Sequence, residues 1–271
     1  IYELIHAINR AKQHEGPILI HAITRKGMGY KNAERNPEKF HGIGPFDKET
    51  GELLVQKTQK TYTDIFSKSL IELARDNKKV VAITAAMPSG TGLKTFKKCY
   101  PKRFFDVGIA EEHAVTFAAG LAAQGMHPVF AVYSSFLQRG YDQVLHDVCI
   151  QKLPVFFCID RSGLVGADGE THQGIFDISY LSHIPNMVLM APKNAREMPE
   201  MMKFALAYDG PVAMKYPRGS VYDGLSEFNV PVELGKSEVI YEGRDVVILS
   251  VGNIMEECEE AVRVLQEEGY H

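Results

Sequence analysis

Hydrophobic and polar positions follow two different patterns along the middle of the chain. Several short apolar runs have the continuous character of buried parallel strands, namely KVVAITAAM, RFFDVGI, PVFAVYS, PVFFCID, MVLMAPK and PVAMKYP. Segments with apolar residues at helical spacing separate these runs and predict helices starting at Tyr62, from Glu111 to Ala123, from about Leu137 to Ile150 and from Asn194 to Tyr208. Strands that alternate with helices in this way predict an α/β fold, in which helices flank a parallel sheet.

The flanks of this region carry only parts of a similar pattern. Apolar residues follow helical spacing from Ile1, so we expect the chain to begin within a helix, and ILIHAIT over 18–24 predicts a buried strand. Near the other end, DVVILSVG predicts one strand and IMEECEEAVRVLQEEG one amphipathic helix. We therefore expect one complete domain between two partial ones. The expected boundaries are a partial domain over 1–45, a linker over 46–60, the complete domain over 61–222, a linker over 223–244 and a partial domain over 245–271.

The composition of the chain argues against several classes of binding partner. The formal net charge is only −4 and no run of like charges occurs, so nothing points to nucleic acid or to an acidic membrane surface. No apolar stretch approaches the roughly 20 residues that span a bilayer. The cysteines stand singly, without the spacing of a zinc or redox motif, so we expect reduced thiols, no metal site and an intracellular protein. Small molecules are the expected partners.

Residues that are suited to ligand binding or catalysis follow the ends of the predicted strands. In parallel sheets ligands bind beyond the carboxyl ends of the strands, so the turns after four of them should share one edge. These turns contain Glu111, Glu112 and His113; Tyr133, Phe136 and Arg139; Arg161, Asp168, His172 and Gln173; and Arg218. The sequence therefore predicts a ligand site lined by acidic, aromatic, imidazole and guanidinium groups.

Two interpretations are open for the acidic pair at the start of the second helix. Glu111 and Glu112 would both be favourable there because of the helix dipole, and this structural role alone would explain them. The helix behind them, AVTFAAGLAAQG, is almost wholly apolar and small, which predicts that it is buried. Glu111 would then lie at a packed interface, where a carboxylate needs a partner, and this favours a functional role.

The loop SGLVGADGETHQG is polar, rich in glycine and longer than a simple turn between strand and helix. Such loops often hold ligands, although a solvated surface loop is the alternative. Arg161 and Arg218 both lie just past strand ends and suit bidentate capture of phosphate or carboxylate, with structural ion pairing as the alternative for each. Arg139 could instead pair with Asp142.

Four segments together resemble the thiamine-diphosphate-dependent transketolase superfamily, and most closely its 1-deoxy-D-xylulose-5-phosphate synthase family. They are GIAEEHAVTFAAG, YSSFLQRGYDQVLHD, IQKLPVFFCIDRSGLVGADGETHQG and MKYPRG. Tyr133, Phe136, Leu137, Gln138 and Arg139 distinguish this resemblance from one to transketolases or pyruvate dehydrogenase beta subunits. The resemblance implies a thiamine diphosphate-binding fold. Residues 61–222 would be its pyrimidine-binding domain, 1–45 the end of a diphosphate-binding domain, and 245–271 the start of a C-terminal transketolase-like domain.

The resemblance also implies an activity. This is the decarboxylative condensation of pyruvate with D-glyceraldehyde 3-phosphate to 1-deoxy-D-xylulose 5-phosphate and CO2, by a transferase of the methylerythritol phosphate route to isoprenoids that also supplies thiamine and pyridoxal biosynthesis. The implied cofactors are thiamine diphosphate and Mg2+, and the implied state is a homodimer in the bacterial cytoplasm or in the plastid stroma of a plant. The alternatives are a family enzyme with another acceptor and a non-catalytic pyrimidine-binding module.

Residue roles carried over from the resemblance are as follows. Glu111 would hydrogen-bond the cofactor pyrimidine, Phe136 would stack on it, Ile109 and Lys26 would also contact the cofactor, Arg139 and Asp168 would line the substrate pocket, His172 would assist proton transfer, and Tyr133, Arg161, Arg218 and His41 would bind substrate. The family's glycine-aspartate-glycine stretch with its downstream asparagine, which binds magnesium and diphosphate, is absent from this sequence. We therefore expect the metal ligands to lie upstream, and these residues alone to be inactive.

Overall fold

The computed structural model describes residues 1–54 and 59–271, apart from the side chain of Ala167. The chain divides into two compact units, Ile1–Thr58 and Gln59–His271. The first unit contains helices α1 (Tyr2–Ala11) and α2 (Lys31–Arg35) and a small aromatic cluster. In this cluster the rings of Tyr30 and Phe46 both lie against Phe40, each with a centroid separation of 5.3 Å.

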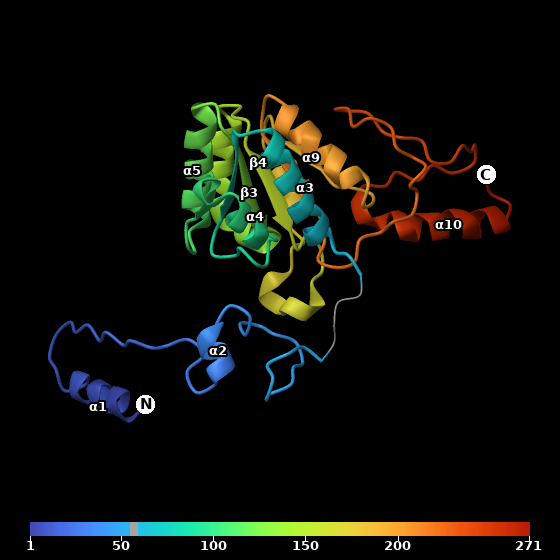
Figure 1. Cartoon of the computed structure of the whole chain (residues 1–271). Helices are drawn as coiled ribbons and strands as arrows, with labels where there is room; N and C mark the ends of the chain where they lie inside the picture. The colour runs from blue at the N-terminus through green and yellow to red at the C-terminus, as the bar shows by residue number, and fades with distance from the viewer. Residues whose placement is uncertain (55–58) are drawn as a thin grey trace. The chain divides into compact units, whose positions relative to one another are not determined.

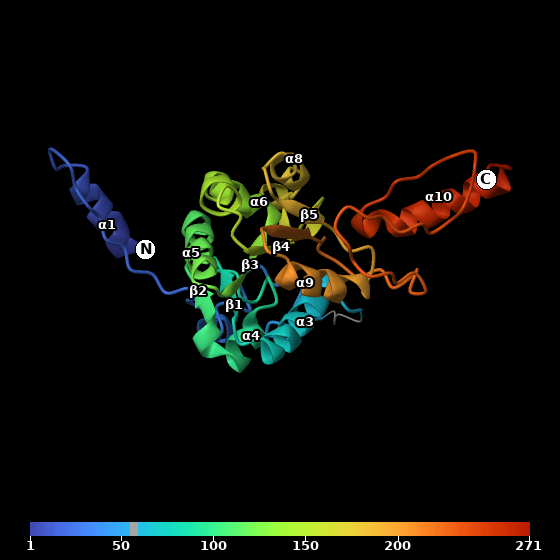
Figure 2. The same cartoon turned by 90° about the horizontal axis from the view of Figure 1, so that it is seen from above.

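A six-stranded sheet forms the centre of the second unit (Figures 1 and 2). Its strand order is β2-β1-β3-β4-β6-β5, and every neighbouring pair is parallel. The strands are β1 (Val80–Thr84), β2 (Phe104–Asp106), β3 (His127–Tyr133), β4 (Phe156–Asp160), β5 (Val188–Met190) and β6 (Val212–Lys215). The predicted parallel sheet flanked by helices is therefore confirmed.

Helices cover both faces of this sheet and enclose a separate hydrophobic core on each face. The first core packs α3, α4 and α9 against the sheet, and the second packs α5 and the segments that follow β3. The helices of this unit are α3 (Tyr62–Asp76), α4 (Lys94–Cys99), α5 (Glu111–Ala123), α6 (Ser134–Leu137), α7 (Tyr141–Gln143), α8 (Asp177–Leu181), α9 (Glu197–Ala207) and α10 (Met255–Glu267), with a π-helical turn over Val144–Cys149 and 3-10 turns over Pro101–Arg103, Gln138–Gly140, Gly166–Asp168, Glu170–His172 and Gly252–Ile254.

Helix α3 shows how the sequence sets an element in place. The Thr61 hydroxyl accepts a hydrogen bond from the Asp64 backbone N–H at 3.2 Å, and the Asp64 carboxylate accepts one from the Thr61 N–H at 3.0 Å. This reciprocal capping satisfies two backbone donors at the helix start. Phe66 and Leu70 then follow at four-residue spacing and are fully buried, each contributing about 1.5–3 kcal/mol by leaving water.

Helix α5 has the predicted bounds, whereas the stretch predicted as one helix from about Leu137 to Ile150 is helical but not a single regular α-helix. In its place α6, a 3-10 turn, α7 and the π-helical turn follow one another. Gly140 lies within this stretch and packs closely on α5, because a Cβ there would be only 3.2 Å from Val115 Cγ2. Glycine weakens a helix and permits this close approach, so the irregular path serves packing on α5.

Two predicted strands do not form among the described residues. The segments at 18–24 and 245–252 lack any strand assignment, and Leu19 and Leu249 are 91% and 89% exposed. A strand is held by hydrogen bonds to a neighbouring strand, and no described strand pairs with either segment, so apolar character alone does not order them. Helix α9 begins at Glu197, three residues later than predicted, and its N-cap residue Arg196 makes no side-chain cap hydrogen bond. The Asn194 side chain accepts a hydrogen bond from the Glu197 N–H at 3.0 Å.

The described cysteines are all free thiols, with Cys149 and Cys158 buried and Cys99 exposed. Within the described ranges, no helix is both long and apolar enough to cross a bilayer. No group of three or more His, Cys, Asp or Glu side chains in these ranges is arranged to hold a metal ion.

Candidate active site

The site forms at the carboxyl edge of the sheet, where β3, β4 and β6 end. Tyr133 is the last residue of β3, Arg161 follows β4 directly, and Arg218 lies just beyond β6. The loop over 162–174 brings Asp168 and His172 to the same place. The structure thus brings together, by direct contact, six side chains that the sequence predicts for one site: Tyr133, Phe136, Arg161, Asp168, His172 and Arg218.

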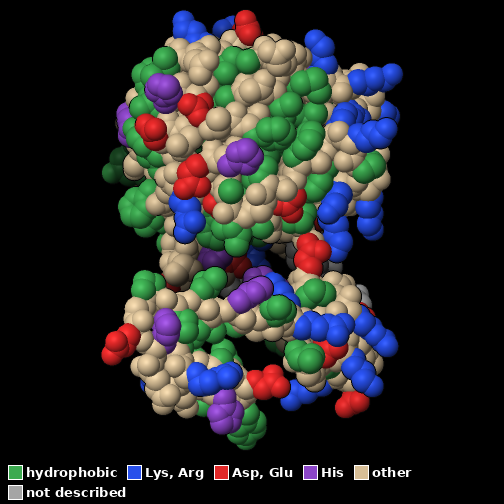
Figure 3. Space-filling view, turned by 90° about the vertical axis from the view of Figure 1, so that its left-hand side faces the viewer, with side chains coloured by type: hydrophobic (Ala, Val, Ile, Leu, Met, Phe, Trp, Pro, Cys, Tyr) green, Lys and Arg blue, Asp and Glu red, His purple; other side chains and the backbone are tan. Residues whose placement is uncertain are grey.

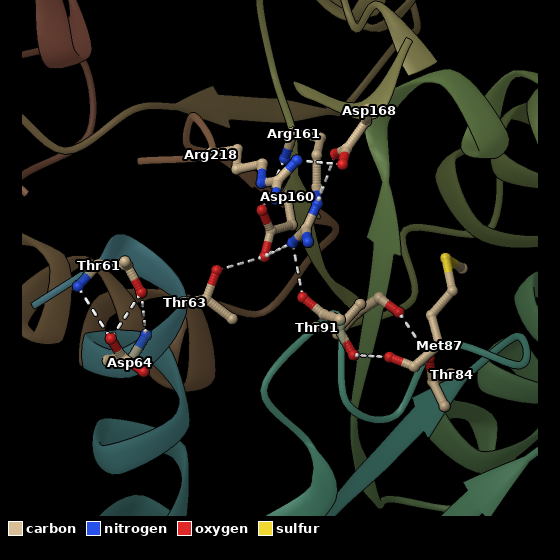
Figure 4. A network of polar contacts seen from close by, with 12 residues as sticks. Thr61, Thr63, Asp64, Thr84, Met87, Thr91, Asp160, Arg161, Asp168 and Arg218 are labelled. Carbon is tan, nitrogen blue, oxygen red and sulfur yellow. Dashed lines mark hydrogen bonds and ion pairs between the residues drawn. The ribbon is translucent and has the colours of Figure 1, made fainter. Parts of the chain in front are cut away.

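Arg161 is the most constrained of these residues (Figure 4). Its backbone has φ of 60°, a left-handed conformation that costs about 1–3 kcal/mol in a residue other than glycine and is often found at functional sites. Its Nη1 donates a hydrogen bond to the Gly90 carbonyl at 2.6 Å and lies 3.0 Å from Asp160 Oδ2. The guanidinium carbon lies 4.1 Å from the centre of the Tyr133 ring, in a cation–π contact. Contacts on several sides therefore fix the guanidinium group.

Asp160 supports this arrangement from within the protein. Its side chain is fully buried, and its carboxylate accepts hydrogen bonds from the Thr63 hydroxyl at 2.8 Å and from the Arg161 backbone N–H at 2.7 Å. Burial raises the pKa of Asp160, and the positive charge of Arg161 opposes this increase. Gly90 permits the close packing here, because a Cβ at that position would be 1.8 Å from the Tyr133 hydroxyl oxygen.

Asp168 lies between the two predicted anion-binding arginines. Its carboxylate contacts Arg218 Nη1 directly, and its Oδ2 lies 3.5 Å from Arg161 Nε. Asp168 Oδ2 and Arg161 Nε are both buried and have no hydrogen-bond partner among the residues that the structure describes. Two guanidinium groups thus face one carboxylate, the geometry that suits an anionic group such as phosphate.

Aromatic rings form a second wall of the site. The Tyr133 and Phe136 ring centroids are 5.4 Å apart, and Phe136 meets the His172 ring edge to face at 5.1 Å. Burial raises the pKa of Tyr133, so its hydroxyl is protonated and can donate a hydrogen bond at neutral pH. The wall combines apolar ring faces with one hydroxyl and one imidazole.

The loop that carries Asp168 and His172 is held by hydrogen bonds across its base. Gly163 and Gly174 exchange two backbone hydrogen bonds, of 2.7 and 2.9 Å, which close the loop. Within it, the Gln173 side chain accepts from the Val165 N–H at 2.8 Å and donates to the Gly169 carbonyl at 2.8 Å. These bonds give a long, glycine-rich segment a defined conformation.

Glu111 occupies a different environment at the start of α5. Its side chain is only 3% exposed, and its Oε2 atom has no hydrogen-bond partner in the part of the chain that the structure describes. Burying a carboxylate oxygen without a hydrogen-bond partner costs free energy, and such an atom is typical of a ligand-binding site. The neighbouring Glu112 is exposed, so the two acidic residues have different surroundings.

Two more predicted residues of the second unit, Ile109 and Arg139, make no described contact with Arg161, Asp168 and Arg218, which we call the arginine cluster. Ile109 is 80% exposed just before α5, and Arg139 is exposed without an ion pair to Asp142 among the described residues. Lys26 and His41 belong to the Ile1–Thr58 unit, where both are exposed. Their roles therefore stay predictions.

Sequence reasoning missed two residues of the site, Thr63 and Asp160. Asp160 ends the apolar run PVFFCID, so a charged residue at the end of a buried strand was the signal that could have found it. Thr63 lies 97 residues away from Asp160 in the chain, and nothing in its local pattern points to the site.

The chain is similar in sequence to a known family and to named proteins. The profile of the family "Transketolase, pyrimidine binding domain" matches residues 58–223. A protein of Caldanaerobacter subterraneus subsp. tengcongensis named 1-deoxy-D-xylulose-5-phosphate synthase is 54% identical over 271 residues, covering 99% of this chain and 43% of that protein. A protein of the same name from Clostridium acetobutylicum is 55% identical over 259 residues, covering 94% and 41%. The chain thus spans about two fifths of the length of the curated relatives it matches.

Solved structures show the same architecture. One described as "Split gene transketolase, inactive beta4 tetramer" has a TM-score of 0.71 and 30% identity, and the match covers 78% of this chain and 69% of the other. A transketolase mutant from Pichia stipitis has a TM-score of 0.63 at 15% identity over 79% of this chain and 34% of the other, a likeness that concerns the fold alone. Because the family profile spans the sheet, its helices and the arginine cluster, the chain belongs to the transketolase pyrimidine-binding domain family.

Proposed function

We propose that this chain carries the pyrimidine half of an active site that condenses pyruvate with D-glyceraldehyde 3-phosphate, giving 1-deoxy-D-xylulose 5-phosphate and CO2. The observation that carries the proposal is the convergence of Arg161 and Arg218 on the single carboxylate of Asp168, beside the wall of Tyr133, Phe136 and His172. Identity above 50% to proteins named as that synthase supports it along nearly the whole chain.

Glu111 would bind the pyrimidine ring of thiamine diphosphate. The buried Oε2 atom has no partner among the described residues and can accept a hydrogen bond from a protonated ring nitrogen, so this acceptor fits the group. Phe136 would stack on the same ring, with Ile109 beside it. When bound, the cofactor supplies the electron sink for decarboxylation, while these residues orient it and exclude water.

The arginine cluster would bind the acceptor substrate. Arg161 and Arg218 would hold its phosphate in place of Asp168, and the Tyr133 hydroxyl would hydrogen-bond the acceptor. Asp168 and His172 would then be free to hold and move protons on the reacting oxygens, with Arg139 lining the pocket. Lys26 would bind the cofactor and His41 the substrate.

Further parts of the proposal concern the whole protein. Residues 61–222 would form the pyrimidine-binding domain between the remnant at 1–45 and the domain start at 245–271, joined by linkers at 46–60 and 223–244. Residues outside this chain would hold Mg2+ together with the diphosphate group of the cofactor. On the side of the second unit that carries α5, hydrophobic side chains lie in several groups between charged and other side chains (Figure 3). The protein would be a homodimer. The setting would be the methylerythritol phosphate pathway, in the bacterial cytoplasm or a plastid.

One comparison favours a second candidate function. The solved structure described as an inactive beta4 tetramer of a split gene transketolase matches this chain over 69% of its own length. In this candidate, the chain would belong to a pyrimidine-binding subunit that is inactive without a partner carrying the metal-diphosphate site. Adding such a partner chain and measuring CO2 release would distinguish this candidate from a single-chain synthase.

The experiment that tests the proposed function uses the full-length protein containing this chain. Release of CO2 and formation of the five-carbon sugar phosphate are measured with pyruvate and D-glyceraldehyde 3-phosphate. Glu111→Ala should nearly abolish turnover while circular dichroism shows an intact fold. Glu112→Ala is the matched control and should retain activity, since this neighbouring carboxylate is exposed. Near-normal turnover of Glu111→Ala would overturn the cofactor assignment.

A further inference from the structure

Two groups without a place in the proposed chemistry lie directly behind Arg161. Thr63 is in the first turn of α3, and Asp160 is the last residue of β4. The Thr63 hydroxyl donates a 2.8 Å hydrogen bond to Asp160 Oδ2, the same oxygen that lies 3.0 Å from Arg161 Nη1 (Figure 4). A chain of contacts thus runs from α3 through a fully buried carboxylate to the guanidinium group.

This contact chain restricts the guanidinium to one orientation. The Asp160 carboxylate accepts from Thr63, from the Arg161 backbone N–H and from Arg161 Nη1, so a buried charge is paired on several sides. The Gly90 carbonyl also accepts from Nη1, and the Tyr133 ring covers one face of the group. Arg161 Nε lies 3.5 Å from Asp168 Oδ2 and makes no hydrogen bond to any described residue. The edge of the Arg161 guanidinium that carries Nε and faces Asp168 is therefore the one available to an incoming anion.

We propose that Thr63 and Asp160 are positioning residues that aim Arg161 at the phosphate of the acceptor substrate, and thereby set the affinity for phosphorylated over unphosphorylated aldehydes. The inference rests on the proposed function, because the acceptor is taken from it. Neither residue touches the substrate. Their effect on recognition passes through the orientation of Arg161, whose guanidinium would lose part of its support if the Thr63 hydroxyl were removed.

Thr63→Val tests this in the full-length protein, because valine keeps the shape of threonine and lacks the hydroxyl. The expected result is a rise of about tenfold in KM for D-glyceraldehyde 3-phosphate, as for the loss of one hydrogen bond to a charged group. KM for pyruvate and KM for unphosphorylated glyceraldehyde should not change. Thr63→Ser, which restores a hydroxyl, should recover the affinity, and Asp160→Asn should have a larger effect than Thr63→Val.

Thr61→Val is the matched control, since Thr61 lies two residues earlier and its hydroxyl contacts Asp64 at the start of the same helix (Figure 4). This control should lower the melting temperature and leave both aldehyde KM values unchanged. Unchanged KM for the phosphorylated aldehyde in Thr63→Val would overturn the inference, and so would an equal rise for both aldehydes, because that would indicate general damage.

Calorimetric titration with inorganic phosphate gives a second measurement that does not need turnover. Thr63→Val should bind phosphate about tenfold more weakly than the unmodified protein. If the unmodified protein does not condense the two substrates but binds phosphate in a manner that depends on Thr63, the proposed function fails and the positioning role stands. If it condenses them and Thr63→Val matches it in both measurements, the function stands and the positioning role fails.

Discussion

The buried carboxylate at the start of α5 leads to a prediction about stability. Glu111 is 3% exposed, and its Oε2 atom has no hydrogen-bond partner within the described part of the chain. A buried polar atom without a partner costs about 1–3 kcal/mol. The interaction of a negative charge in the first turn with the helix dipole stabilises the folded state by about 0.3–1 kcal/mol. Replacing Glu111 with methionine, an apolar side chain of similar length, should therefore raise the free energy of unfolding of the cofactor-free chain by about 1 kcal/mol.

Urea denaturation of this chain, followed by circular dichroism, measures the change. A gain of about 1 kcal/mol corresponds to an increase of roughly 0.3–1 M in the unfolding midpoint. Glu112→Met is the matched control, because Glu112 is exposed and its substitution removes only the interaction with the dipole, which should lower the midpoint slightly. If Glu111→Met instead lowered the free energy of unfolding by about 1 kcal/mol or more, Glu111 would be a structural residue and the reasoning would be refuted.

Two further predictions concern the arginine cluster and the buried thiols. Arg218→Ala should raise KM for the phosphorylated acceptor by about tenfold and change KM for pyruvate little, because the acceptor phosphate would lose one guanidinium partner. Initial rates with each substrate varied in turn measure both KM values, and a larger rise in KM for pyruvate than for the acceptor would contradict the prediction. Burial raises the pKa of the Cys149 thiol from 9.0 to about 12, so the folded state keeps a proton that the unfolded state loses. This stabilising contribution is complete below pH 9.0 and is lost as the pH rises toward 12, so the urea midpoint should fall on the alkaline side, and less so in Cys149→Ala; equal falls in both proteins would exclude Cys149 as a cause.

The class of the fold could be predicted because parallel strands are buried on both faces. Such strands must be continuous apolar runs, and β1 and β4 are fully buried along their length. The strand order β2-β1-β3-β4-β6-β5 could not be predicted, since it depends on how the connecting helices pack. The same apolar signal was wrong at 18–24 and 245–252, where no described strand supplies the hydrogen bonds that a strand needs.

For the site, the sequence by itself determined which kinds of side chain stand after the strand ends. The carboxyl-edge rule for parallel sheets was then enough to bring Arg161, Arg218 and Asp168 to one place. Only the tertiary structure decided that Asp168 lies between the two arginines, and that Thr63 supports Arg161 through Asp160 across 97 residues of sequence. The physical reason is that side-chain hydrogen bonds act over about 3 Å in space, so contacts between distant segments follow from packing and leave no mark in local sequence pattern.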